Sequence, residues 1–154
     1  MTAGAAISCD VAPARVDESG AYATLHGQCF GTGWRADEFS AYAADPDCVV
    51  LGAHIEARLA GLIVCRSVSD EAEIITLAVE TQLRRRGLAR ALWRGARERL
   101  ARMGAARVFL EVGANNEAAR GLYGTLGFDE VGLRQAYYRH GDEDALIMAM
   151  TISD

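Results

Sequence analysis

The chain has 154 residues, of which 51% are hydrophobic, 24% charged and 7% aromatic. This length fits one domain, and these fractions exclude a disordered, collagen-like or coiled-coil protein. No run approaches the roughly 18 apolar residues of a membrane span, and no apolar run follows the first basic residue, Arg15, as a secretory signal would require. We expect one cytoplasmic domain over residues 1–154, with a loose terminus at 1–6 and no membrane partner.

Cysteine and histidine residues are too scattered to suggest a metal site. Four cysteines and three histidines are dispersed through the chain without a CxxC pair. A zinc site usually needs closely spaced ligands. We therefore expect reduced thiols and no metal.

Charge is distributed unevenly between the two halves of the chain. Residues 1–77 contain 4 Arg and 11 acidic residues, whereas residues 78–154 contain 12 Arg and 10 acidic residues. An acidic first half could receive a basic substrate, and clustered arginines could bind an anion, although a solvated acidic face explains the first half equally well. The net charge of −5 and the lack of aromatic residues among the arginines, Trp93 excepted, disfavour nucleic acid.

The first half predicts helices followed by a sheet. In chain order we expect a short strand at 7–11, helices at 17–30 and 37–44, and strands at 48–55, 59–67 and 71–79. Because only short breaks separate the last three strands, they should form an antiparallel meander.

The second half changes to helical spacing. Apolar residues recur on one face from Gly87 to Met103, and Gly104 is suited to end that helix. Further along we expect a strand at 108–112, a helix at 116–126, and strands at 128–133 and 145–152. The prediction is therefore a mixed α/β (α+β) fold of about seven strands and four helices.

The turn before the helix at Gly87 is the strongest local feature. Arg84, Arg85 and Arg86 precede a glycine at a helix start, where backbone N–H groups and the helix dipole favour an anion such as pyrophosphate. The segment is neither a Walker loop nor a dinucleotide fingerprint. A solvated, arginine-rich helix turn is the alternative.

Two later segments carry further candidates. Glu111 is a carboxylate inside an apolar strand, where a charge needs a partner or a purpose. Asn116 is a good N-cap for the next helix, and Tyr123 falls late in it.

These segments together resemble the GCN5-related N-acetyltransferases. Arg84 to Ala89 matches the family pattern Q/R-x-x-G-x-G/A, and the helix ending in Leu122-Tyr123 with Gly127-Phe128 matches its second hallmark. Residues 20–152 further resemble the RimI-type ribosomal-protein alanine N-acetyltransferases. The resemblance implies the GNAT fold, with a central twisted, mostly antiparallel sheet, and an acyltransferase that uses acetyl-CoA.

The resemblance also implies a role for each candidate. Glu111 would be the general base and Tyr123 the proton donor to the departing thiolate, although ion pairing and core packing are their alternatives. The coenzyme would contact Leu77, Ala78, Val79, Arg84, Arg85, Arg86, Gly87, Leu88, Ala89, Arg90 and Asn116. The acceptor would be lined by Trp34, Phe39, Tyr137 and Tyr138, which could equally be core residues.

The expected acceptor is the α-amino group of an alanine at a protein N-terminus, basic and from the small ribosomal subunit. Gly113 replaces the Arg usual in the RimI type, Asn115 stands where Ser is common, and Gly31 to Trp34 lacks Pro before Trp. These departures leave lysine, polyamine or another small amine open as acceptors. A non-catalytic CoA-binding regulator is a further alternative, and the resemblance implies a monomer or weak dimer.

Overall fold

A seven-stranded sheet forms the centre of the computed structural model, which describes residues 5–31, 33–138 and 143–152, without the side chains of 136–138. Its order is β1-β2-β3-β4-β5-β7-β6, and every neighbouring pair is antiparallel except β4 and β5. The strands are β1 (Asp10–Pro13), β2 (Cys48–Ile55), β3 (Arg58–Val68), β4 (Glu71–Val79), β5 (Arg107–Gly113), β6 (Asp129–Tyr138) and β7 (Glu143–Thr151).

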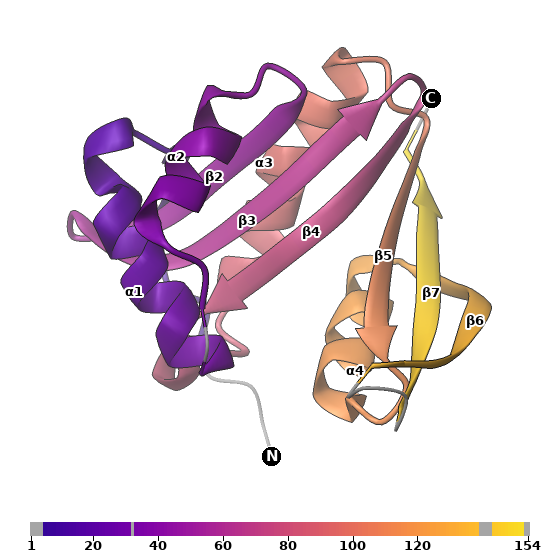
Figure 1. The fold of residues 1–154 in the computed structure, drawn as a ribbon. Coiled ribbons are helices and arrows are strands. Elements are labelled where there is room, and N and C mark those ends of the chain that lie inside the picture. The colour runs from indigo at the N-terminus through magenta and orange to yellow at the C-terminus, as the bar shows by residue number, and fades with distance from the viewer. Residues whose placement is uncertain (1–4, 32, 139–142, 153–154) are drawn as a thin grey trace.

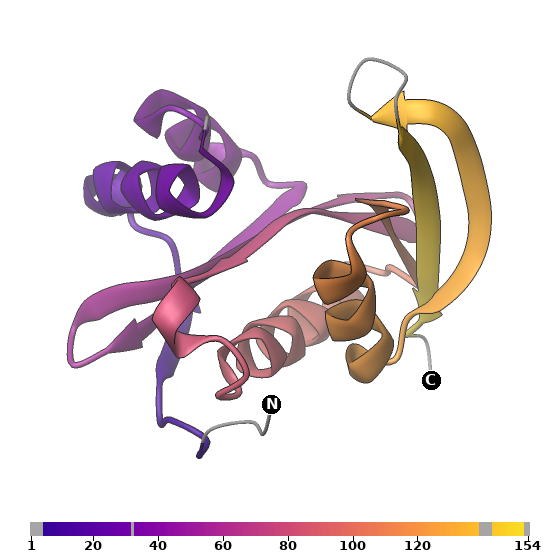
Figure 2. The same ribbon diagram turned by 90° about the horizontal axis from the view of Figure 1, so that it is seen from below.

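Two pairs of helices cover opposite faces of this sheet (Figures 1 and 2). On one face lie α1 (Ser19–Phe30) and α2 (Ala36–Ala44), and on the other lie α3 (Leu88–Arg102) and α4 (Glu117–Leu126). Short 3-10 turns, η1 (Val16–Glu18) and η2 (Thr81–Leu83), precede α1 and the loop into α3. Each face therefore has its own buried cluster, the larger one under α3 and the smaller under α1 and α2.

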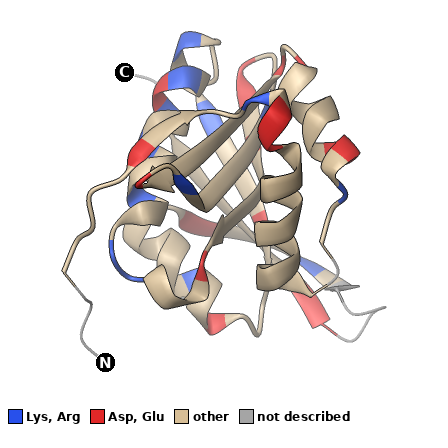
Figure 3. Ribbon diagram, turned by 90° about the vertical axis from the view of Figure 1, so that its left-hand side faces the viewer, with Lys and Arg blue, Asp and Glu red and all other residues tan. Residues whose placement is uncertain are grey.

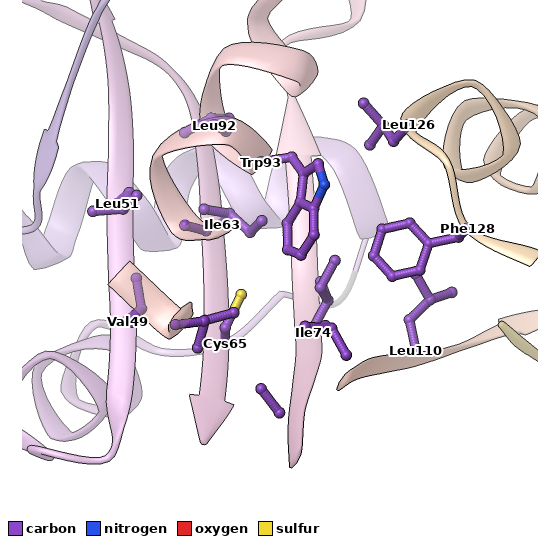
Figure 4. Close-up of a cluster of buried hydrophobic side chains, with 14 of the residues drawn as sticks. Val49, Leu51, Ile63, Cys65, Ile74, Leu92, Trp93, Leu110, Leu126 and Phe128 are labelled. Atoms are coloured by element: carbon purple, nitrogen blue, oxygen red, sulfur yellow. The ribbon is translucent and has the colours of Figure 1, made fainter. Parts of the chain in front are cut away.

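Helix α3 follows directly from its apolar spacing. Leu88, Leu92, Ala96 and Leu100 are each at most 1% exposed and face the larger cluster, where Trp93 also packs (Figure 4). Full burial of a leucine side chain contributes about 1.5–3 kcal/mol. The apolar face alone is thus sufficient to dock the helix, and the prediction of this element is confirmed.

Strands β4 and β5 are neighbours for only part of their length. Their parallel pairing joins Glu71–Glu73 to Arg107–Phe109, and beyond it the two strands diverge (Figure 1). A register shift against β3 leaves Ile75 as an extra residue in β4. Such a bulge bends a strand and increases its twist. The second half of β4 therefore keeps one edge that β5 does not occupy.

The predicted mixed fold is confirmed, including the antiparallel meander of β2, β3 and β4. The first strand begins at Asp10 rather than at Ile7, because the Ile7 N–H donates to the Arg86 carbonyl instead. That strand also includes Pro13, which an edge strand tolerates.

The predicted strand at 128–133 extends to Tyr138 as β6. Its pairing with β7 is irregular, and Val131 and Leu133 are about half exposed, so the apolar alternation that marks a strand is weak here. Among the described residues, no helix combines the length and apolar character needed to cross a membrane.

Candidate active site

The free edge of β4 is the first component of the site. Leu77, Ala78 and Val79 pair with β3 on one side only, because β5 has diverged. The Leu77 and Ala78 side chains pack into the larger and smaller clusters, respectively. The outward backbone groups of Leu77 and the Val79 N–H could therefore pair with an extended, amide-containing ligand, as an added strand would, whereas the Val79 carbonyl already accepts from Arg84 Nε and Cys29 Sγ.

The turn into α3 supplies backbone donors at the end of that edge. Gly87 caps the helix with φ +93°, a conformation that favours glycine. The first hydrogen bond of the α3 ladder runs from the Ala91 N–H to the Gly87 carbonyl at 3.0 Å. Helical N–H groups before that donor have no carbonyl one turn back, so those of Leu88, Ala89 and Arg90 can serve an anion.

The arginines around this turn have structural partners. Arg84 Nε donates to the Val79 carbonyl at 3.1 Å, Arg86 Nε to the Ala5 carbonyl at 3.0 Å, and an Arg90 Nη to the Thr125 carbonyl at 3.3 Å. These guanidinium groups therefore brace the loop against neighbouring segments. Their positive charge still lies beside the helix start, and basic residues recur in this loop and along α3 (Figure 3).

Glu111 projects from β5 away from the larger cluster, since Leu110 and Val112 on either side are buried in it. Its side chain is 22% exposed, and its Oε1 lies 3.3 Å from a guanidinium nitrogen of Arg134 on β6. The Glu111 carboxylate therefore has an ion-pair partner, as the alternative to a role as general base requires, and it remains partly open to solvent.

A groove of about 430 Å³ borders Glu111. It is lined by residues of β3, β4, β5, β6 and β7. The charged residues among them are Arg66, Glu71, Glu73, Glu111 and Arg134. Three carboxylates meet two guanidinium groups there. Such a groove can receive a polar or basic chain next to Glu111.

Asn116 and Tyr123 hold opposite ends of α4. Asn116 Oδ1 accepts the Ala119 N–H at 3.1 Å, so the side chain is the N-cap, and the cap uses only the amide oxygen. Tyr123 is half-buried, and its ring meets Phe128 edge to face at 5.9 Å. Phe128 in turn packs 5.1 Å from Trp93 (Figure 4). Tyr123 thus has a packing role whether or not it also donates a proton.

The predicted acceptor residues lie in different environments. Phe39 is 2% exposed and belongs to the smaller cluster, so its ring offers almost no surface to a ligand. Trp34 is half-buried and stacks on His26 and Tyr42. The side chains of Tyr137 and Tyr138 lie outside the described residues.

Two polar contacts near the site were not predicted from the sequence. His26 is 5% exposed and its Nε2 lies 3.2 Å from Thr76 Oγ1 on β4, and Arg134 pairs with Glu111. Burial lowers the pKa of His26 from its ordinary value, and Glu38 opposes this more weakly. The partners are far apart in sequence, so no local pattern could have indicated them.

The unusual glycine at position 113 has a structural reason. A Cβ there would lie 2.5 Å from Glu143 Oε2. That oxygen accepts the Asn115 N–H at 2.7 Å. The absence of a side chain at Gly113 therefore lets Glu143 close over the loop between β5 and α4.

Comparison with known sequences matches this chain to one family. The family model described as Acetyltransferase (GNAT) family matches residues 21–128. An Escherichia coli K12 protein named ribosomal protein bS18-alanine N-acetyltransferase is 42% identical over 98 residues, which are 62% of this chain and 66% of that protein. A Mycobacterium tuberculosis protein named N-alpha-acetyltransferase RimI is 34% identical over 125 residues, 79% of this chain and 77% of that protein.

A solved structure agrees with these sequence matches. The crystal structure of the Escherichia coli ribosomal-protein-S18-alanine N-acetyltransferase superposes with a TM-score of 0.84 at 30% identity, covering 96% of both chains. The architecture described above is thus similar to that enzyme over nearly its whole length.

Proposed function

The chain belongs to the acetyltransferase (GNAT) family, whose members are acyltransferases that use acetyl-CoA, and on this premise we propose that it acetylates a protein N-terminus. The acceptor in this proposal is the α-amino group of an N-terminal alanine on a basic small-subunit ribosomal protein in the cytoplasm. The named substrate of the Escherichia coli relative supports this choice.

The observation that carries the proposal is the divergence of β4 and β5. Three features adjoin it: the free edge of β4 after Glu73, the loop into α3 that follows β4, and Glu111 two residues after Phe109 on β5. An extended thioester could bind along the edge, its phosphates at the helix start, and its reactive end near a carboxylate. These three features together support a site for acetyl transfer from a coenzyme.

We assign each part of the coenzyme to residues of β4, of the loop into α3 or of the start of a helix. The pantetheine arm would pair with the backbone of Leu77, Ala78 and Val79, as an extended peptide adds to a strand edge. The pyrophosphate would bind the backbone from Gly87 to Arg90. Arg84, Arg85 and Arg86 would add positive potential, and the Asn116 side chain would contact the arm beyond its capping role.

The proposed chemistry is direct transfer of the acetyl group from sulfur to nitrogen. An N-terminal amine has a pKa of about 8 and is largely protonated at neutral pH, so it must lose a proton before attack. Glu111 would accept that proton, directly or through water. As the new C–N bond forms and the C–S bond breaks, Tyr123 would donate a proton to the thiolate.

The acceptor would approach through the groove beside Glu111. The carboxylates of Glu71 and Glu73 favour a basic segment there. We place Trp34 at the margin of this approach with Tyr137 and Tyr138, and we assign Phe39 a supporting role because its ring is buried.

The test is acetylation of a peptide panel followed by mass spectrometry of the modified atom. The assay combines the purified chain and acetyl-CoA with a panel of acceptors. The panel contains peptides beginning with alanine or other residues, internal-lysine peptides and small amines. Acetylation of the α-amine of a basic, alanine-starting peptide is the expected result. Transfer confined to lysine or small amines would overturn the acceptor, and no transfer to any amine would overturn the enzymatic function.

The Glu111→Gln variant tests the proposed base in the same assay. We expect turnover to fall about 100-fold or more, because a positioned base contributes typically 10²–10⁴-fold, while the Kd for acetyl-CoA stays within about twofold. Glu98→Gln is the matched control, since it removes an exposed carboxylate of α3 that does not line the groove, and it should retain turnover. Equal turnover in Glu111→Gln and the wild type would contradict the role of Glu111.

A further inference from the structure

His26 connects two parts of the site that are distant in sequence. The Trp34 N–H donates to its Nδ1 at 3.2 Å, and its Nε2 lies 3.2 Å from Thr76 Oγ1. Because Nδ1 accepts a hydrogen bond, the neutral ring carries its proton on Nε2, which donates to Thr76. One buried imidazole therefore bonds both the segment after α1 and strand β4.

The Trp34 end of this connection is packed closely against α1. The His26 ring stacks 4.8 Å from the Trp34 ring and lies 4.6 Å from Phe30. A Cβ at Gly33 would lie 2.6 Å from the backbone N of Gly27, so a side chain at position 33 would not fit. Glycine at position 33 thus allows the chain to approach α1 closely enough for the Trp34 N–H to reach the imidazole.

The Thr76 end depends on the bulge in β4. Ile74 pairs with Cys65 and Thr76 with Val64, so that Ile75 is extra. As a result Ile74 packs in the larger cluster, whereas Ile75 contacts the smaller cluster and Thr76 meets α1. Without the bulge, Thr76 would share the face of Ile74, because side chains alternate along a strand.

We propose that neutral His26 is a positioning residue that holds the acceptor-side segment at Trp34 against the coenzyme-side strand at Thr76. This rests on the proposed function, in which Trp34 borders the acceptor and the residues after Thr76 bind the coenzyme. Both ring nitrogens are used and the side chain is 5% exposed, so His26 itself does not touch the reacting atoms. It sets where the amine meets the thioester.

The connection depends on the protonation state of His26. A proton on Nδ1 would oppose the Trp34 N–H donor and break that bond. Among the described residues, the charged group that acts on His26 is Glu38 on α2, while β4 presents the uncharged Thr76. Acidification below the usual histidine range should therefore weaken acceptor binding in the wild type.

Two substitutions separate the two bonds. His26→Asn places an amide oxygen near the Nδ1 position. This keeps an acceptor for the Trp34 N–H and removes the group that donates to Thr76 Oγ1. His26→Gln reaches the Nε2 position and does the reverse, and Thr76→Val removes the hydroxyl at similar volume. We expect His26→Gln and Thr76→Val to raise the peptide KM about 5- to 10-fold, with the acetyl-CoA Kd within about twofold and Thr76→Ser near wild type.

The pH profile distinguishes positioning from packing. The ratio of wild-type to His26→Asn peptide KM should rise as pH falls from 7 toward 5, because the asparagine oxygen accepts at every pH. Titration of the peptide amine cancels in this ratio. A packing role alone would lower Tm and active fraction in the variants and leave both peptide KM and the ratio constant, which would overturn the proposal.

Failure of this proposal and failure of the proposed function give different results. A wild-type chain that acetylates no amine removes the function and, with it, the role of His26 in substrate placement. A wild-type chain that acetylates the peptide while His26→Gln and Thr76→Val keep its KM removes only the role of His26.

Discussion

At the scale of single residues, the arginines at the start of α3 have a structural role as well as the positive charge that the sequence shows. Arg84, Arg86 and Arg90 cluster around the start of α3, yet each directs hydrogen bonds to a backbone carbonyl. A guanidinium that braces a loop still contributes positive potential, because its charge is unchanged. The anion site that we propose would thus use backbone N–H groups in a positive field.

Tyr123 has an observed packing role and a proposed role as proton donor, and the two can be separated. Tyr123→Phe should keep the edge-to-face contact with Phe128 and leave Tm nearly unchanged, while turnover falls about 100-fold because the proton donor is lost. The rate of CoA thiol release and a thermal melt measure the two effects.

The control for this variant is Tyr22→Phe. The Tyr22 hydroxyl is buried and makes no hydrogen bond to any described residue, and it lies in the other cluster. Removing it should leave turnover unchanged. If Tyr123→Phe also turned over at the wild-type rate, Tyr123 would be a packing residue only.

At the scale of elements, the start of α3 depends on backbone conformation more than on side chains. Gly87 has φ +93°, and among the described residues a Cβ there would have only Ala6 within 4 Å, so strain rather than a clash opposes substitution. We expect Gly87→Ala to lower the free energy of unfolding by about 1 kcal/mol and to weaken acetyl-CoA binding.

The matched control is Gly121→Ala in the middle of α4, where a Cβ would meet no atom of the described part of the chain within 4 Å. That change should raise stability by about 0.5–1 kcal/mol, as alanine does in a helix. Urea unfolding and calorimetric titration with acetyl-CoA measure both variants. Unchanged coenzyme binding in Gly87→Ala would place the phosphate site elsewhere.

At the scale of the whole molecule, the sheet consists of two parts joined by a short parallel contact. Only Glu71–Glu73 and Arg107–Phe109 pair between β4 and β5, whereas β2, β3 and β4 pair along nearly their whole length. A ligand bound along the free edge of β4 would satisfy backbone groups there and stabilise the folded state, by an amount that grows with the logarithm of the free ligand concentration above Kd.

Hydrogen exchange should detect this stabilisation. At a free acetyl-CoA concentration of 100 times Kd, the free energy of unfolding should rise by about 2.7 kcal/mol. Amides of Leu77 and Val79 and of residues 88–90 should gain protection beyond any global increase, while those of β2 should follow the global increase alone. Uniform protection throughout the chain would contradict binding at the β4 edge.

Much of this molecule could be inferred from local pattern. The apolar spacing of α3, the runs that became β2, β3 and β4, and the glycine turn at Gly87 are decided by neighbours within a few residues, so they can be recognised in the chain itself. The family could be recognised for the same reason, because its motifs are contiguous segments, and the comparisons confirm it.

Other features depend on which strands meet and in what register. The bulge at Ile75, the contact of His26 with Thr76, and the ion pair of Glu111 with Arg134 join residues from separate elements. A one-residue change of register moves a side chain to the opposite face of a sheet, and nothing local sets that register. Sequence pattern therefore predicted the elements and the candidate chemistry, whereas packing between distant segments determined which side chains surround the site.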